Sequence, residues 1–308
     1  MDISPKVSVC IPTFNGESYI RDAINSVLQQ KYQNFEVVIV DNCSTDRTET
    51  LVEELYSQTE KIRFFKNEQN IGLAGNLNKC LEYARGEYIK YLCVDDMLLP
   101  DCLEKMVAAL NEHSTVCLVC GGRISIDEAG RPFGLRRYSA RKEVVKGPEV
   151  ITRCLFGGNF IGEPTAVMFR KWDLHAQFRE DLPQLMDMEM WFRLLENGDL
   201  FNIETPLCSI RFHELQMTQY NIRSGRLIED NICLFNEFCQ KPYLTVTPYL
   251  LIQHKLLMTY RLWVSRKFMT RETMQSVLTR FGIRFAYPFM PMISSLIALK
   301  KKFSRTAG

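Results

Sequence analysis

The first 120 residues alternate between short apolar runs and segments with helical spacing, and this alternation constrains the fold more than any other feature. The apolar runs are rich in β-branched and aromatic residues, which favour strands, and occupy residues 7–11, 35–40, 62–65, 88–94 and 116–120. Apolar residues recur every three or four positions between them, in residues 17–30, 46–56, 74–84 and 101–113. This pattern predicts an α/β fold in which a mostly parallel central sheet is flanked by helices.

Polar residues gather where the predicted strands end. They are Thr13, Asn15, Asp41, Asn42, Asn67, Asn70, Asp95 and Asp96. Ligands of open α/β sheets bind beyond the carboxyl ends of the strands, so these residues predict a polar site along one rim. No Gly-x-Gly-x-x-Gly follows the first strand and no Gly-x-x-x-x-Gly-Lys-Ser/Thr occurs anywhere. The sequence therefore argues against a Rossmann dinucleotide site and against a P-loop.

An adjacent pair of carboxylates, Asp95 and Asp96, follows the predicted strand 88–94 directly. Two neighbouring carboxylates repel each other and are unfavourable when buried without a partner, so we expect a cation beside them. Carboxylate oxygens favour Mg²⁺ or Mn²⁺, and such ions commonly bridge a protein to a diphosphate. The alternative interpretation is an acidic loop that opens the next helix, with Asp101 as its cap.

Composition describes an ordinary globular chain, in which 46% of the residues are hydrophobic. Most of the 11 cysteines lie in apolar runs, where cysteine behaves as a small hydrophobic residue. Cys117 and Cys120 have zinc-like spacing, but no second pair at ligand spacing accompanies them. Residues 1–6 lack a basic segment followed by an apolar one, so no secretory signal is expected. These observations predict a cytoplasmic protein.

The second part of the chain contains a polar excursion, a loop rich in helix breakers and a further helix. Residues 125–146 are polar and without clear periodicity, and residues 157–164 form the loop, whose composition is typical of a substrate pocket. A strand is predicted at 165–169 and a helix at 187–195, with Asp187 at the start of the helix.

Several ordered motifs link these elements to a known family. They are VCIPTFNGE at 9–17, VIVDNCSTD at 38–46, NIGLAGN at 70–76, ARGEY at 84–88, LCVDD at 92–96, DMEMWFR at 187–193 and RFH at 211–213. With these motifs in this order and spacing, the chain resembles glycosyltransferase family 2 over roughly residues 6–220. The resemblance implies the GT-A fold and inverting transfer of a sugar from a nucleotide-sugar donor.

The resemblance also implies roles for individual residues. Asp187 matches the catalytic base, and Asp41 matches the carboxylate that hydrogen-bonds the nucleotide base. Asp95 and Asp96 replace the metal-binding DxD motif, with Asp96 expected to make the direct contact with Mn²⁺ or Mg²⁺, and His213 matches a histidine near the metal or diphosphate. The remaining nucleotide-sugar residues implied are Pro12, Thr13, Asn15, Glu17 and Asn76, with Asp95 beside them.

Two departures from the family pattern affect these expectations. Many relatives carry an acidic residue two positions before the aspartate pair, where this chain has Cys93. Metal ligation would then depend on the aspartate pair with the diphosphate as co-ligand. Relatives also often carry arginine before the cleft asparagine, where Gly75 stands here, so a sugar or diphosphate contact would move to Lys79 or Arg85.

The expected function is transfer of a sugar to a glycan or lipid-linked acceptor, in surface polysaccharide synthesis. One alternative is a sugar-1-phosphate nucleotidyltransferase, although residues 12–16 do not supply the Gly-rich, Arg-containing loop expected of such an enzyme. Another is an inactive relative that binds nucleotide sugars as an assembly partner. For single residues, the alternatives are a helix N-cap for Asp187 and a solvated loop histidine for His213.

The charge distribution divides the chain. Residues 221–308 contain 14 Lys and Arg against 4 Asp and Glu, whereas residues 1–220 contain 24 against 32. We therefore expect a GT-A domain at 1–220, with a nucleotide-binding half (1–120) and an acceptor and catalytic half (121–220), followed by a basic helical extension at 221–308. The apolar segment 285–299 before Lys300–Lys302 predicts peripheral contact with an anionic membrane on its cytoplasmic face, or a helix packed on the body. No nucleic-acid partner is expected.

Overall fold

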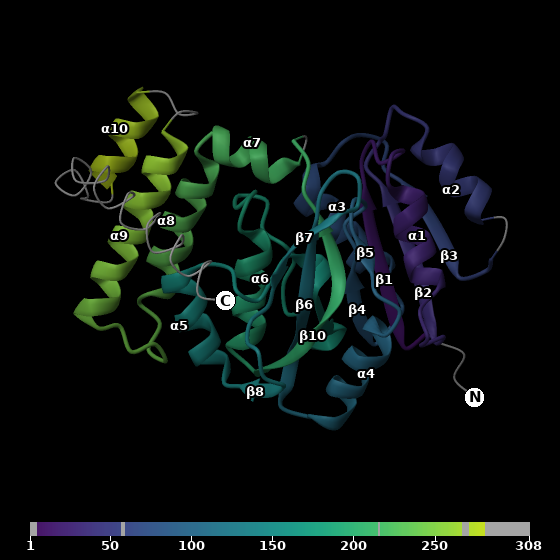
Figure 1. Cartoon of the computed structure of the whole chain (residues 1–308), viewed down its shortest axis with the longest axis horizontal. Coiled ribbons are helices and arrows are strands. Elements are labelled where there is room, and N and C mark those ends of the chain that lie inside the picture. Colours follow the sequence, from purple (N-terminus) through teal and green to yellow (C-terminus); the bar gives the residue numbers. More distant parts are fainter. Residues whose placement is uncertain (1–4, 57–58, 215, 267–270, 281–308) are drawn as a thin grey trace. The chain divides into compact units, whose positions relative to one another are not determined.

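The computed structural model describes residues 5–56, 59–214, 216–266 and 271–280 (Figure 1). The chain divides into two compact units. The first comprises residues 1–154 and 159–214, and the second comprises residues 155–158 and 215–308. The first unit therefore ends at residue 214, six residues before position 220, where the sequence led us to expect the end of the first domain.

A ten-stranded sheet forms the centre of the first unit. Its main path runs in the order β3 (Ile62–Lys66), β2 (Phe35–Asp41), β1 (Val7–Thr13), β4 (Tyr88–Tyr91), β9 (Val167–Arg170), β6 (Val116–Ile126), β10 (Asp199–Arg211) and β5 (Met97–Leu98). Strand β7 (Pro132–Arg136) pairs with β6, and β8 (Glu143–Val145) pairs with β10. Strands β3, β2, β1 and β4 are parallel, as are β6 and β10, whereas β9 is antiparallel to both of its neighbours.

Helices pack around this sheet (Figure 1). Helix α3 packs on β1 and β2, α4 packs on β6, β9 and β10, and α6 packs on β6. The helices are α1 (Ile20–Leu28), α2 (Thr48–Tyr56), α3 (Gly72–Tyr83), α4 (Cys102–Glu112), α5 (Gly147–Gly157) and α6 (Met186–Leu195), with short 3₁₀ helices at Pro164–Ala166 and Lys171–Asp173. The predicted α/β class, a central sheet flanked by helices, is confirmed.

Three local predictions differ from the structure. Strand β4 ends at Tyr91 because the backbone N–H of Cys93 donates to Thr165 Oγ1 (3.0 Å) instead of continuing the ladder. The predicted strand 165–169 begins as a 3₁₀ helix and becomes β9 only at Val167. Strand β10 was not predicted, because Pro206 interrupts its apolar pattern and coincides with a shift in register against β6.

The second unit contains four described helices, α7 (Met217–Arg223), α8 (Arg226–Phe238), α9 (Pro248–Ser265) and α10 (Arg271–Arg280). Phe235 of α8 stacks on the buried His254 of α9, with ring centroids 3.7 Å apart. In the ranges that the structure describes, no helix has both the length and the hydropathy needed to cross a bilayer. The apolar segment 285–299 and Lys300–Lys302 lie outside the described residues.

Candidate functional site

Two loops are hydrogen-bonded to each other at the carboxyl ends of β1 and β2. Asp41, fully buried at the end of β2, accepts bonds from the backbone N–H of Ser44 (3.1 Å) and from the Ser44 hydroxyl. The same hydroxyl oxygen accepts the backbone N–H of Asn15 (2.8 Å), and Asn15 Oδ1 accepts the N–H of Thr45 (2.9 Å). Asn15 has φ of 51°, a left-handed conformation that asparagine tolerates. The predicted nucleotide residues Asn15 and Asp41 are thus brought together.

Glu17 adds a second connection between these loops. Its backbone N–H donates to Asp46 Oδ2 (3.0 Å), and its carboxylate accepts the N–H of Arg47 (2.9 Å). Phe14 directly precedes Asn15 in sequence and is 46% exposed. An exposed aromatic ring beside a rigid polar turn offers a flat apolar surface to a ligand.

Pro12, Thr13 and Asn76 are buried rather than presented at the rim. Asn76 Nδ2 donates to the backbone oxygen of Val40 (2.9 Å), and its Oδ1 accepts from Asn67 Nδ2 (3.0 Å). These bonds hold α3 against β2, so the structure gives Asn76 a positioning contact within the fold. Pro12 and Thr13 are the last two residues of β1 and pair with Val40 and Asp41 of β2.

The aspartate pair lies where β4 has ended, and its two members have different surroundings. Asp96 is buried: Oδ1 accepts the backbone N–H of Arg211 (3.0 Å) and Oδ2 accepts the Thr165 hydroxyl (2.6 Å). Burial, and secondly the charge of Asp95, raise the pKa of Asp96 well above its ordinary value. Asp95 retains more solvent access, and its Oδ2 lies 3.1 Å from Nε2 of His213. Asp95 is therefore the more available of the two carboxylates.

Two cationic side chains bond to backbone oxygens near the pair. The Arg211 guanidinium donates from Nε to the backbone oxygen of Asp95 (3.0 Å) and from Nη1 to the backbone oxygen of Glu128 (2.8 Å). Lys90, fully buried in β4, donates from Nζ to the backbone oxygen of Thr165. Thr165 thus connects the Lys90 ammonium to the Asp96 carboxylate.

The donor set fits a divalent ion that is completed by its ligand. Adjacent ligands of an octahedral ion with bonds of 2.0–2.1 Å are about 3 Å apart. Asp95 Oδ2 and His213 Nε2 are 3.1 Å apart, which is also a hydrogen-bond distance, and both are donor types that bind divalent ions. Among the described residues, no group of three or more His, Cys, Asp or Glu side chains is placed to hold a metal. These two side chains alone do not form a metal site, so an ion at this position would need further ligands.

Asp187 is the second residue of α6 and lies in crowded surroundings. Its Oδ1 accepts the backbone N–H of Met188 (2.7 Å), and Oδ2 accepts a bond from Asn159 Nδ2 (3.3 Å). Desolvation by the surrounding protein raises the pKa of Asp187 to about 7, and the charge of Glu163 adds to the effect. A carboxyl group with a pKa near neutrality is suited to accept a proton in a reaction at that pH.

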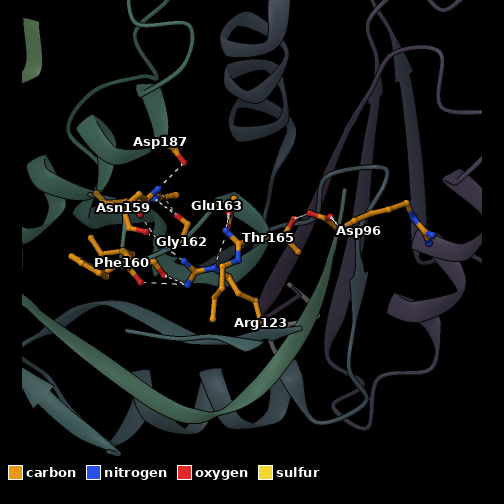
Figure 2. A network of polar contacts seen from close by, with 12 residues as sticks. Asp96, Arg123, Asn159, Phe160, Gly162, Glu163, Thr165 and Asp187 are labelled. Atoms are coloured by element: carbon orange, nitrogen blue, oxygen red, sulfur yellow. Dashed lines mark hydrogen bonds and ion pairs between the residues drawn. The ribbon is translucent and has the colours of Figure 1, made fainter. Parts of the chain in front are cut away.

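One segment, residues 159–165, bonds to both carboxylate sites (Figure 2). Asn159 at its first position contacts Asp187, and Thr165 at its last position contacts Asp96. Figure 2 shows Asp187 and Asp96 at opposite ends of this network. The shape of the segment therefore determines how the two carboxylates are placed relative to each other.

The same segment is attached to the sheet by a buried arginine of β6. Arg123 Nε lies 2.9 Å from Glu163 Oε2, and its Nη1 donates to the backbone oxygen of Ile161 (3.1 Å). Burial alone would raise the pKa of Glu163, but Arg123 and Arg136 outweigh burial and lower it. Arg123 is buried and Glu163 is partly exposed, so the segment is held by an ion pair whose arginine loses its main partner if Glu163 is removed.

Sequence reasoning missed several residues of this network. Arg211 was matched only as part of a motif, and neither Asn159, Arg123 nor Glu163 was assigned a role. A loop rich in Gly and Pro that also contains Asn and Glu was the available signal, because polar side chains in such a loop commonly bond to a neighbouring site.

The raised pKa of Asp187 makes stability depend on pH. In the unfolded chain, the Asp187 carboxyl has a pKa of about 3.9. The stability that the folded protein gains from the raised pKa of Asp187 is therefore fully present below about pH 4 and is lost as the pH rises through about 7. Asp187→Asn removes this loss. We expect the free energy of unfolding of Asp187→Asn, minus that of the wild type, to increase by about 2 kcal/mol between pH 5.5 and pH 8.5. Urea unfolding measures this, with Asp181→Asn as a control that stays flat. A constant difference for Asp187→Asn would contradict the raised pKa.

Comparison with known proteins places the chain among sugar-transferring enzymes. The model of the family described as glycosyl transferase family 2 matches residues 8–175. The uncharacterized glycosyltransferase RT0329 of Rickettsia typhi is 30% identical over 244 residues, which cover 77% of this chain and 73% of that protein.

Two solved structures share the fold. S. aureus TarS 1–349 in complex with UDP-GlcNAc has a TM-score of 0.59 at 20% identity, over 90% of this chain and 88% of that chain. In another TarS structure, this chain covers 54% of the longer TarS chain. The mannosyltransferase PcManGT of Pyrobaculum calidifontis, in complex with GDP-Man and Mn²⁺, has a TM-score of 0.60 at 17% identity, over 96% and 80%. These likenesses confirm the predicted GT-A architecture.

Proposed function

Because the chain belongs to glycosyltransferase family 2, we propose that it is an inverting, metal-dependent enzyme that moves a sugar from a nucleoside diphosphate to a glycan or lipid-linked acceptor. Surface polysaccharide synthesis is the process we propose for it. One observation carries the mechanism: the segment 159–165 bonds to Asp187 at one end and to Asp96 at the other. A base and a diphosphate site joined in this way suit a displacement that needs both at once.

The nucleotide is proposed to bind at the carboxyl ends of β1 and β2. Asp41 ends β2 with both carboxylate oxygens bonded to Ser44, so it would hydrogen-bond the base once the Ser44 turn opens, while Phe14 would stack on the base. Asn15 and Glu17 would hold the two loops in the shape that receives the nucleotide. The complexes of TarS with UDP-GlcNAc and of PcManGT with GDP-Man support a donor of this class.

Mn²⁺ or Mg²⁺ is proposed to bind at Asp95 and His213, and the Mn²⁺ in the PcManGT complex supports this choice. The bound ion would neutralise the charge that grows on the leaving diphosphate. We assign the direct contact to Asp95 rather than to Asp96, since both oxygens of Asp96 already accept bonds within the protein. Asp96 would instead fix the backbone at Arg211, two residues before His213.

Asp187 is proposed to accept the proton of the acceptor hydroxyl. The acceptor oxygen forms a bond to the anomeric carbon while the bond from that carbon to the diphosphate oxygen breaks, and the proton moves to the carboxylate of Asp187. A single displacement from the face opposite the leaving group inverts the anomeric configuration. Asn159 positions the carboxylate through its bond to Oδ2.

A thermal-shift screen tests the donor class. The wild-type chain is mixed with nucleoside diphosphates, with their sugars and with Mn²⁺ or Mg²⁺, and the mixtures that stabilise it are assayed for release of nucleoside diphosphate. Release of nucleoside diphosphate from a nucleotide sugar identifies a glycosyltransferase. Release of inorganic pyrophosphate from a nucleoside triphosphate and a sugar 1-phosphate would instead identify a nucleotidyltransferase. Binding without any turnover would favour the assembly-partner alternative.

The C-terminal unit is proposed to contact an anionic membrane, which would bring the enzyme to a lipid-linked acceptor. Helix α9 buries His254, Met258 and Leu262, yet exposes Tyr249 and Ile252. Leu256, at helical spacing from both, is also exposed. Exposed apolar residues at this spacing beside a net basic sequence favour an interfacial helix.

Vesicle co-sedimentation tests the membrane proposal. We expect the full chain to sediment with phosphatidylglycerol vesicles, and removal of residues 281–308 to weaken that binding at least tenfold because it deletes five of the basic side chains. Phosphatidylcholine vesicles are the control and should bind little. Equal binding by the truncated and full chains would rule out the terminal segment as the contact.

A further inference from the structure

Three large apolar side chains are exposed together where β6, β7 and β10 end. Phe133 and Leu135 of β7 are 63% and 51% exposed, and Phe212, the first residue after β10, is 37% exposed. The rings of Phe133 and Phe212 contact each other edge to face, with centroids 5.5 Å apart. Single exposed apolar residues are ordinary, whereas Phe133 and Phe212 contact each other across β6, and Leu135 lies two residues from Phe133 on the same face of β7. We call Phe133, Leu135 and Phe212 the aromatic platform.

The platform is continuous with the proposed donor site. The backbone N–H of Phe212 donates to the oxygen of Ile126 (2.9 Å), which prolongs the β6–β10 pairing by one residue. Phe212 stands between Arg211, which bonds to Asp96, and His213, which contacts Asp95. Phe212 is therefore the sequence neighbour of both residues that contact the aspartate pair.

An ion pair fixes the platform to the segment that joins the two carboxylate sites. The Arg136 guanidinium lies 5.0 Å from the centroid of the Phe212 ring, in cation–π contact. Its Nη1 donates to Glu163 Oε1 (2.8 Å), and Glu163 belongs to the segment 159–165. The platform and the proposed base are thus held by the same part of the chain.

The chemistry of the platform favours a neutral, partly apolar ligand. The two arginines nearest the rings are paired with carboxylates, Arg136 with Glu163 and Arg131 with Asp127 (both 2.8 Å), so their charges are already balanced within the protein. Three side chains of this size expose only about 300 Å² together, less than the about 800 Å² per partner typical of a stable protein interface. A sugar ring fits, because its C–H bonds pack on the negative face of an aromatic ring.

We propose that the aromatic platform binds the acceptor, with a neutral pyranose ring stacked on Phe212 and Phe133 and its attacking hydroxyl directed toward Asp187. This inference rests on the proposed glycosyltransferase function and adds the acceptor subsite to it. Phe133 and Phe212 are then specificity-determining residues, which favour sugars that present an apolar face over those with charged substituents.

Saturation-transfer NMR on the full chain tests the platform without requiring turnover. The probes are methyl glycosides of glucose, galactose, mannose and N-acetylglucosamine, each as both anomers, in the presence of the nucleoside diphosphate that most stabilises the protein. We expect saturation transfer to the ring protons of at least one probe, reduced at least fivefold in Phe133→Ala and in Phe212→Ala. Phe133→Tyr, which keeps the ring, should restore it.

Trp172→Ala is the matched control, since Trp172 is 56% exposed and packs near Tyr88, at the opposite end of β4 from the site. It should leave saturation transfer unchanged. The proposal would be overturned if the wild type showed no saturation transfer to any probe. It would also be overturned if both phenylalanine variants showed the same saturation transfer as the wild type. The thermal shift caused by the nucleotide is measured in parallel, because its absence would count against the proposed function and not against the platform.

Discussion

Asp187→Asn is expected to lower the rate of sugar transfer about 10³-fold, since general base catalysis contributes about 10²–10⁴-fold. The amide keeps the size and the hydrogen bond to Met188, but it has no lone pair basic enough to take a proton. Nucleotide-sugar affinity with Mn²⁺ should stay within about twofold, because Asp187 contacts neither the β1–β2 rim nor Asp95 in the structure. Transfer kinetics and calorimetric titration of the donor measure the two quantities.

The wild-type pH profile supplies an independent check of the same assignment. Burial raises the pKa of Asp187 to about 7, so kcat/KM should rise with pH and level off above about that value. Asp181→Asn is the control, because Asp181 is exposed and pairs with Arg179. Undiminished transfer by Asp187→Asn would remove Asp187 as the base.

Asp95→Ala is expected to abolish the increase in nucleoside diphosphate affinity that Mn²⁺ produces, a loss of at least about 100-fold. Asp95 supplies the available carboxylate oxygen, and His213 alone is a single ligand. The wild-type protein should bind Mn²⁺ weakly without nucleotide, since two protein donors hold an octahedral ion poorly. Titration of nucleoside diphosphate with and without Mn²⁺ measures the difference.

Asp96→Ala separates the two members of the pair. It should also weaken nucleotide binding with Mn²⁺, but with a loss of stability of about 1–3 kcal/mol, because the Arg211 N–H and the Thr165 hydroxyl lose their acceptor. Asp95→Ala should cause little loss of stability. An unchanged response to Mn²⁺ in Asp95→Ala, with a lost response in a folded Asp96→Ala, would return the direct contact to Asp96.

The sequence predicts the first half of the fold well because each strand there is a short apolar run with a helix behind it. Strand β10 shows why the second half is harder: its pairing with β6 crosses a bulge near Pro206, and only the tertiary partner makes that segment extended. Likewise, β4 stops at Tyr91 because the N–H of Cys93 bonds to the Thr165 hydroxyl, 72 positions further along the chain. Contacts at such separations leave no periodicity in the sequence.

The candidate site divides in the same way. Asp41, Asp95 and Asp96 are predicted from the sequence because they follow apolar strands, whereas the role predicted for Asp187 comes from its motif's resemblance to the family. The sequence does not reveal that Asp95 and Asp96 have different surroundings. That difference depends on which groups contact each carboxylate oxygen. The bond from Asn159 to Asp187 and the ion pair of Arg123 with Glu163 are equally invisible, since each joins segments that are distant in the chain.

The reaction that we propose for this chain is a single displacement at the anomeric carbon of a nucleotide sugar. The most direct measurement follows the anomeric proton by NMR while the wild-type chain, with Mn²⁺, consumes the donor that most stabilises it. A single displacement predicts a first-formed product with the anomeric configuration opposite to that of the donor. We expect no product from Asp187→Asn. A product that retains the donor configuration, or equal turnover by Asp187→Asn, would contradict it.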